Sequence, residues 1–72
     1  MTFYEYIKRF VDPKAEEPIS LLANIINQDQ SFPKHSSKFD EISDYIEHSV
    51  AYTNLVKYFD EAWTQYQFER GI

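Results

Sequence analysis

Residues 55–66 read LVKYFDEAWTQY and carry one of the four helical patterns of the chain. Apolar side chains recur in this stretch every three or four positions, which is the spacing of one face of an α-helix. The members of that face are Leu55, Val56, Phe59, Ala62, Trp63 and Tyr66. The pattern predicts a helix over about residues 51–69, and we expect its aromatic side chains to pack in the core rather than to form a recognition surface.

Local signals predict both ends of this helix. Thr53 or Asn54 could cap its main part, because short polar side chains accept hydrogen bonds from free N–H groups at a helix start. Gly71, the only glycine in the chain, is predicted to end it.

Two earlier segments show the same helical spacing. Thr2 and Glu5 have the form of a capping box, and this first helix should stop before Pro13, because the residue preceding a proline is disfavoured in helices. Pro18 suits the first position of a second helix, where no N–H is needed. The inward faces are predicted to hold Phe3, Tyr6, Ile7, Phe10 and Val11 in the first, and Ile19, Leu22, Ala23 and Ile26 in the second.

A loop over residues 31–37 is predicted to lead into a third helix, with Phe32 of the loop turned inward. Ser36 or Ser37 is a suitable N-cap for that helix. Its apolar face is predicted to hold Phe39, Ile42, Tyr45 and Ile46.

The composition fits one small helical domain. The 72 residues weigh 8.6 kDa, and 43% of them are apolar and 18% aromatic. No segment shows the sustained alternation of a strand, so we predict an all-α fold, a compact bundle of four to five helices spanning residues 1–72. Tyr4, Tyr52 and Tyr58 fit the apolar faces less well and would mark a partner site if they were exposed together.

Several classes of protein are excluded or disfavoured by the residues present. The absence of cysteine excludes a disulfide scaffold, a thiolate zinc site and a cysteine nucleophile. We see no long apolar run and no basic-then-apolar leader, so we expect a cytoplasmic protein without a membrane segment. The formal charge is −5, and all of it falls in residues 39–72, which carry two basic and seven acidic groups. This half of the chain should repel nucleic-acid phosphates.

Three stretches resemble the YozE-like family of short proteins from low-GC Gram-positive bacteria. They are TFYEYI at residues 2–7, SFPKHSSKFDEISDYIE at 31–47 and FDEAWTQYQ at 59–67. The resemblance covers about residues 2–69 and implies a SAM-like fold, a compact helical domain like the sterile alpha motif. It supplies no catalytic residues, and the nucleic-acid binding suggested for the family rests on fold similarity alone.

The loop before the third helix is a candidate contact site for an anion or a partner. Its residues are Lys34, His35, Ser36, Ser37 and Lys38. Free N–H groups at a helix start attract anions, and the lysines would add to that attraction. The alternative is an ordinary capped helix start with solvated lysines, and Asp40 and Glu41 close by would weaken an anion site.

An acidic face on the third helix is the second candidate site. Asp40, Asp44 and Glu47 share it, and a basic surface is expected near Lys34 and Lys38 or near Lys8 and Arg9. Domains of the SAM type often associate by matching such faces. We therefore expect a non-enzymatic interaction module that binds a protein partner or itself.

Nucleic-acid binding is the alternative function. It would use the start of the third helix together with Lys8, Arg9 and Lys14. The third helix carries four acidic groups from Lys38 to Glu47, which places carboxylates where phosphates would come. The glycine that helix-hairpin-helix modules place in their turn is also missing from this position.

Asp44 and His48 lie four residues apart and would share one helix face, where Glu41 or Glu47 could join them. Such a group could in principle bind a metal or act as a general base. Many exposed helices carry the same residues, so we expect no metal, no cofactor and no catalytic site.

Overall fold

The structure is a computed structural model that describes residues 1–14 and 16–70. Within these ranges it contains no strand, which confirms the predicted all-α fold. Its Cα radius of gyration of 11.1 Å equals the value of about 11 Å expected for a compact chain of this length. No helix of the described ranges is both long and apolar enough to cross a bilayer. The elements are α1 (Phe3–Ile7), η1 (Lys8–Phe10), α2 (Pro18–Gln28), α3 (Phe39–Glu47), η2 (Val50–Tyr52) and α4 (Val56–Arg70), where η marks a short 3-10 turn.

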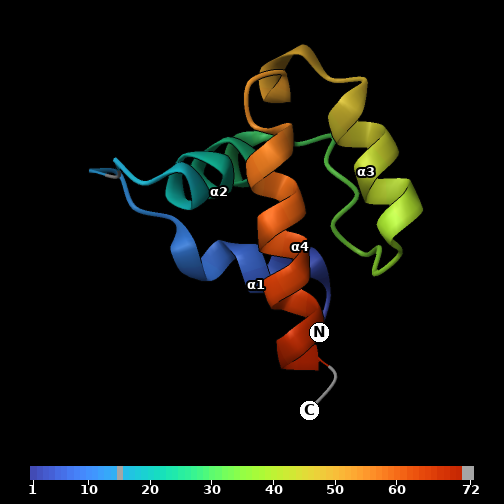
Figure 1. Cartoon of the computed structure of the whole chain (residues 1–72). Coiled ribbons are helices and arrows are strands. Elements are labelled where there is room, and N and C mark those ends of the chain that lie inside the picture. Colours follow the sequence, from blue (N-terminus) through green and yellow to red (C-terminus); the bar gives the residue numbers. More distant parts are fainter. Residues whose placement is uncertain (15, 71–72) are drawn as a thin grey trace.

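Helix α4 contacts all three other helices. In Figure 1 it crosses the middle of the molecule, with α2 on one side, α3 on the other and α1 across its lower end. The Tyr66 hydroxyl donates a hydrogen bond of 2.6 Å to the carbonyl of Met1, so the start of the chain is fixed beside the end of α4. Helix α4 therefore forms the centre around which the other helices pack.

The first helix begins as its capping box predicts. Thr2 Oγ1 accepts the N–H of Glu5, and Glu5 Oε1 accepts the N–H of Thr2, both at 3.2 Å. The helix tightens into η1 and ends before Asp12. There the Asn24 side chain accepts the N–H of Asp12 at 3.0 Å and donates to its carbonyl at 2.8 Å. The bend before Pro13 is thereby attached to α2.

The prediction that Ser36 or Ser37 caps the third helix is wrong. The N-cap is Lys38, and its side chain makes no capping hydrogen bond. Ser36 Oγ instead accepts the N–H of Lys38 at 3.2 Å and donates to Glu41 Oε2 at 2.5 Å. The serine thus fixes the last turn of the loop, and the helix itself starts one residue after Lys38.

The last helix begins at Val56, five residues later than predicted. The turn η2 occupies the intervening segment, and Thr53 Oγ1 donates to the carbonyl of Val50 at 2.9 Å instead of accepting from an N–H group of α4. The carbonyl of Leu55 accepts the first helical hydrogen bonds, from the N–H groups of Tyr58 and Phe59. The predicted stop at Gly71 lies outside the described residues.

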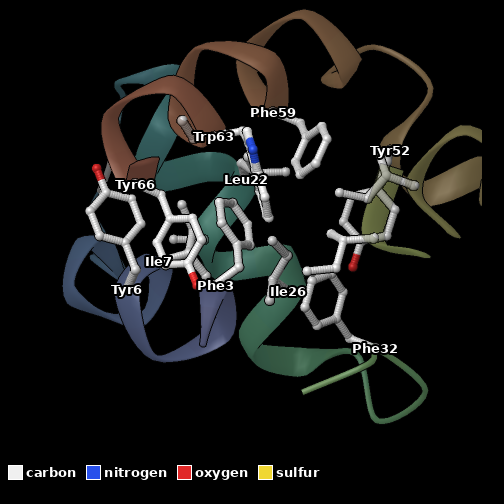
Figure 2. Close-up of a cluster of buried hydrophobic side chains, with 14 residues drawn as sticks. Phe3, Tyr6, Ile7, Leu22, Ile26, Phe32, Tyr52, Phe59, Trp63 and Tyr66 are labelled. Carbon is white, nitrogen blue, oxygen red and sulfur yellow. The ribbon is translucent and has the colours of Figure 1, made fainter. Parts of the chain in front are cut away.

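An aromatic cluster forms the centre of the core. The Phe3 ring lies 5.3–6.1 Å, centroid to centroid, from four other rings, and these come from both ends of the chain (Figure 2). Its contacts with Phe59 and Tyr66 are edge-to-face, and such contacts add to the stability gained from burial alone. The buried side chains are those of Phe3, Tyr6, Ile7, Leu22, Ala23, Ile26, Phe32, Ile42, Ile46, Tyr52, Phe59, Ala62, Trp63 and Tyr66. Trp63 and Tyr66 are therefore core residues, and Phe32 points inward as predicted.

Two predicted inward positions are substantially exposed, at 36% for Val11 and 40% for Phe39. Phe39 still covers the core from outside, because its ring stacks on Phe59 at 5.8 Å. Tyr52 differs from the sequence expectation in the opposite direction, since it is fully buried, and Tyr4 is partly buried. The tyrosines that fitted the helical faces poorly thus form no common exposed patch.

Candidate functional site

Two lysines from separate parts of the chain meet at the ring of Tyr4. The Nζ atom of Lys8 lies 5.5 Å from the ring centroid, and that of Lys34 lies 5.6 Å from it. Both distances fall within the range of a cation–π attraction. We call these three residues the lysine cluster. It combines one residue from each of two basic regions that the sequence left as alternatives.

Local geometry explains why the lysine cluster forms. Lys8 follows Tyr4 by four residues, which places both side chains on the same side of the α1–η1 segment. The buried ring of Phe32 packs against Tyr4 at 6.2 Å, and this contact brings the loop residue Lys34 next to the same ring. The cluster is thus positioned by a contact between residues 28 positions apart.

The other residues of the predicted loop site either make hydrogen bonds within the protein or are exposed to solvent. Ser36 donates to Glu41, and the carbonyl of Ser37 accepts a hydrogen bond of 3.2 Å from Arg70. His35 and Lys38 are exposed at the surface. A shallow groove of about 560 Å³ runs along the loop and includes Glu41 in its lining. A carboxylate therefore stands at the start of α3, where an anion would have to bind.

Arg9 does not belong to the lysine cluster. Its guanidinium pairs with the carboxylate of Glu69 at 3.1 Å and lies 5.9 Å from the Tyr6 ring. This cation joins η1 to the end of α4. Because Arg9 is already paired with Glu69, Lys8 is the basic side chain of the first helical segment that is more available to a binding partner.

The predicted acidic face lies on the solvent side of α3. Asp40, Asp44 and Glu47 are all exposed, and the opposite side of the helix buries Ile42 and Ile46 in the core. Among the described residues, the one cationic group within 4 Å of these three carboxylates is His48, beside Asp44. The face therefore carries negative charge that the described part of the chain leaves largely uncompensated.

Asp44 and His48 form an open surface pair. Their side chains are 76% and 75% exposed, and Nδ1 of the imidazole bonds to the Asp44 carbonyl at 2.7 Å while lying 3.3 Å from its carboxylate. The carbonyl bond, and then the Asp44 charge, raise the pKa of His48. Within the described residues, no three His, Asp or Glu side chains are placed to hold a metal ion.

A polar network around Asp29 was not predicted from the sequence. Oδ2 of this carboxylate accepts hydrogen bonds from the hydroxyls of Tyr45 at 2.6 Å and Tyr52 at 2.8 Å, and Oδ1 accepts the N–H of Ser31 at 3.0 Å. Partial burial acts to raise the pKa of Asp29, but the three hydrogen bonds outweigh it and hold that pKa below its usual range. Burial, and then the bond to Asp29, raise the pKa of Tyr52. No spacing signal could have revealed the two tyrosine partners of Asp29, because they lie 16 and 23 residues away from it.

Comparison with known proteins places most of the chain in one family. The model of the YozE SAM-like fold matches residues 2–68. The UPF0346 protein YozE of Bacillus subtilis strain 168 is 43% identical over 68 residues, which cover 94% of this chain and 92% of that protein. A UPF0346 protein of Streptococcus pyogenes serotype M5 is 35% identical over 65 residues, which cover 90% and 92%. No solved structure matches the chain.

Proposed function

The chain belongs to the YozE SAM-like family of Gram-positive bacterial proteins, and from this premise we propose that it is a non-catalytic module that binds acidic protein surfaces through its lysine cluster. The acidic surface that we assign to it is the α3 face of a second copy. Two copies then meet head to tail, with Lys8 and Lys34 of one against Asp40, Asp44 and Glu47 of the other.

The observation that carries this proposal is the meeting of Lys8 and Lys34 at one ring. The ring of Tyr4 restricts both ammonium groups to one place, so less side-chain entropy is lost when a partner binds there. The acidic face offers three exposed carboxylates in a row on one rigid helix. Opposite charges on separate elements of one chain favour a heterologous contact, in which one copy's lysines meet the next copy's carboxylates.

The expected affinity is low. Exposed ion pairs contribute about 0–1 kcal/mol each, so two or three such pairs supply at most about 3 kcal/mol, which corresponds to a dissociation constant on the order of 10 mM. The net charge of −5 further opposes association at long range. The contact should therefore be seen at high protein concentration and should weaken when salt screens the charges.

Sedimentation equilibrium of the full chain at about 50 and about 500 mM NaCl tests the proposal. We expect oligomers at the lower salt concentration and monomers at the higher one. Lys8→Ala/Lys34→Ala should be monomeric at both, and so should Asp40→Asn/Asp44→Asn/Glu47→Gln. Lys57→Ala is the matched control, because it removes a cation of α4 outside the cluster, and it should behave like the wild type.

Mixing the two groups of variants gives the sharpest result. Each variant alone lacks one half of the contact, but the lysine variant keeps its acidic face and the acidic variant keeps its lysines. Their equimolar mixture should therefore form a one-to-one dimer and no longer chains. A wild-type protein that stays monomeric at low salt and high concentration would refute self-association.

The alternative function, nucleic-acid binding, would use the same two lysines. A DNA titration distinguishes it from self-association. Single-stranded and duplex DNA are titrated into the wild type and Lys8→Ala/Lys34→Ala at low salt. The proposal predicts no binding, because Glu41 and the acidic α3 face repel phosphates. DNA binding that depends on both lysines, in a protein that does not self-associate, would establish the alternative in its place.

A further inference from the structure

A groove between the start of α2 and the middle of α4 lies apart from both surfaces discussed above. It has a volume of about 450 Å³. Pro18 and Ile19 line it from α2, and Tyr58, Ala62 and Gln65 line it from α4. The α4 residues follow one another at helical spacing, so they form a continuous strip along the groove.

Apolar side chains from both helices form the floor of the groove. Ala62 lies beneath it and is only 1% exposed. The apolar surface that a ligand can reach comes from Pro18, Ile19 and Tyr58, which are all partly buried. An extended aliphatic chain can therefore lie along this floor and remove apolar surface from water.

Two carboxylates, those of Glu17 and Glu61, stand at the groove. Glu17 is the N-cap of α2, yet its side chain makes no capping hydrogen bond. No Lys, Arg or His of the described residues comes within 4 Å of either carboxylate. Two cations stand nearby: Lys57, whose Nζ lies 5.9 Å from the centroid of the Tyr58 ring, and Lys14, which lines a neighbouring hollow with Glu17. Asp12 and Glu16 line that hollow too, so four carboxylates against two cations leave the groove and its surroundings negative.

We propose that this groove binds an arginine side chain within an apolar-flanked segment of a partner protein. Arginine carries an aliphatic stem that matches the floor and a charged head that matches the two carboxylates. Its planar guanidinium can also stack on the Tyr58 ring, and its five N–H donors can serve two acceptors at once. Lysine has a smaller and more strongly hydrated head, so it fits the same groove less well.

The size of the groove favours a peptide segment over a free cation. Ligand sites in proteins start at about 300 Å³, so this groove has room for an arginine side chain together with a flanking residue. None of its lining residues belongs to the lysine cluster or to the acidic face of α3. The groove can therefore be occupied while the head-to-tail contact is formed or absent.

NMR titration of the ¹⁵N-labelled full chain tests this inference. The probe is the peptide acetyl-Leu-Arg-Leu-amide, and its matched control replaces arginine with citrulline, which has nearly the same shape but no charge. We expect the arginine peptide to shift the amide signals of the α2 start and of Tyr58, Glu61, Ala62 and Gln65. The citrulline peptide should bind at least about tenfold more weakly, because hydrogen bonds to charged groups are lost.

Variants of the protein then test whether Glu17 and Glu61 bind the arginine side chain. Glu17→Gln/Glu61→Gln should weaken binding of the arginine peptide at least about tenfold. Asp40→Asn/Asp44→Asn removes the same amount of charge from α3 and should leave the affinity within about twofold, since that face lies outside the groove. Gln65→Lys, at an exposed position, should abolish binding by placing a cation in the groove.

Three results would overturn the inference. They are equal binding of the arginine and citrulline peptides, an equal loss of affinity in the groove and α3 variants, and signal shifts that fall elsewhere on the protein. The dispersion of the amide spectrum shows for each variant that the fold is kept. Because the α3 variants serve only as controls here, a failure of this inference leaves the self-association proposal to its own test.

Discussion

The hydroxyl of Tyr52 donates a hydrogen bond of 2.8 Å to the carboxylate of Asp29, across 23 residues of the chain. Tyr52 is fully buried in η2, and Asp29 is the residue that ends α2. The same carboxylate oxygen accepts the hydroxyl of Tyr45 in α3. A single side chain therefore fixes the end of α2, helix α3 and the turn before α4 relative to one another.

Asp29→Ala should destabilise the fold by about 1–3 kcal/mol, because it leaves the buried hydroxyl of Tyr52 without an acceptor. Urea unfolding followed by circular dichroism measures the change. Asp60→Ala is the matched control, since Asp60 is exposed on α4, and it should shift the free energy of unfolding by less than about 0.5 kcal/mol. Equal stability of the Asp29 variant and the wild type would show that the network contributes nothing.

The Asp29 network also predicts an acid-sensitive stability. Folding lowers the pKa of Asp29, so its contribution is present above the ordinary pKa of an aspartate and is lost as the pH falls toward the lower, folded-state value. Unfolding free energies should therefore fall more steeply for the wild type than for Asp29→Asn between about pH 5 and pH 3. Parallel curves for the two proteins would assign the acid sensitivity to other carboxylates.

Trp63→Ala should cost about 3–5 kcal/mol, which is the usual loss for a truncated buried aromatic side chain. Trp63 is 5% exposed and contacts the rings of Phe3, Phe39 and Tyr66 at 4.9–5.3 Å. A loss of this size can equal the whole stability of so small a chain. Phe68→Ala removes an aromatic residue of the same helix that is 67% exposed, and it should cost less than about 1 kcal/mol. Similar losses in both variants would contradict the burial of Trp63.

The parts of the fold that sequence could predict are those with local causes. The capping box of Thr2 and Glu5, the helix start at Pro18 and the inward turn of Phe32 depend on a few neighbouring residues, and all three are found as expected. The start of α4 could not be predicted in this way. The helical spacing there competes with the burial of Tyr52, and Tyr52 binds a residue of α2 that no local pattern connects to it.

In the candidate sites, too, the features with local causes could be predicted and those that depend on distant residues could not. The exposed acidic face of α3 follows from helical spacing alone, so its placement could be predicted. The pairing of Lys8 with Lys34 could not, because it depends on the contact between Tyr4 and Phe32. The groove above the buried Ala62 could not be predicted either, because it depends on how Pro18 and Ile19 of α2 lie against α4.

His48 gives a direct probe of the electrostatics of the α3 face. The imidazole bonds to the Asp44 carbonyl and lies beside the Asp44 carboxylate, and both contacts raise its pKa by favouring the protonated form. Asp44→Asn removes the charge but keeps the carbonyl bond, so the pKa of His48 should fall only part of the way toward that of a free histidine. Titration of the imidazole Hε1 signal by NMR measures the change, and Asp60→Asn, which removes the same charge from α4, should leave it unaltered. An unchanged pKa in Asp44→Asn would mean that the carboxylate is fully screened by solvent, and the same screening would then weaken the proposed contact between this face and the lysine cluster.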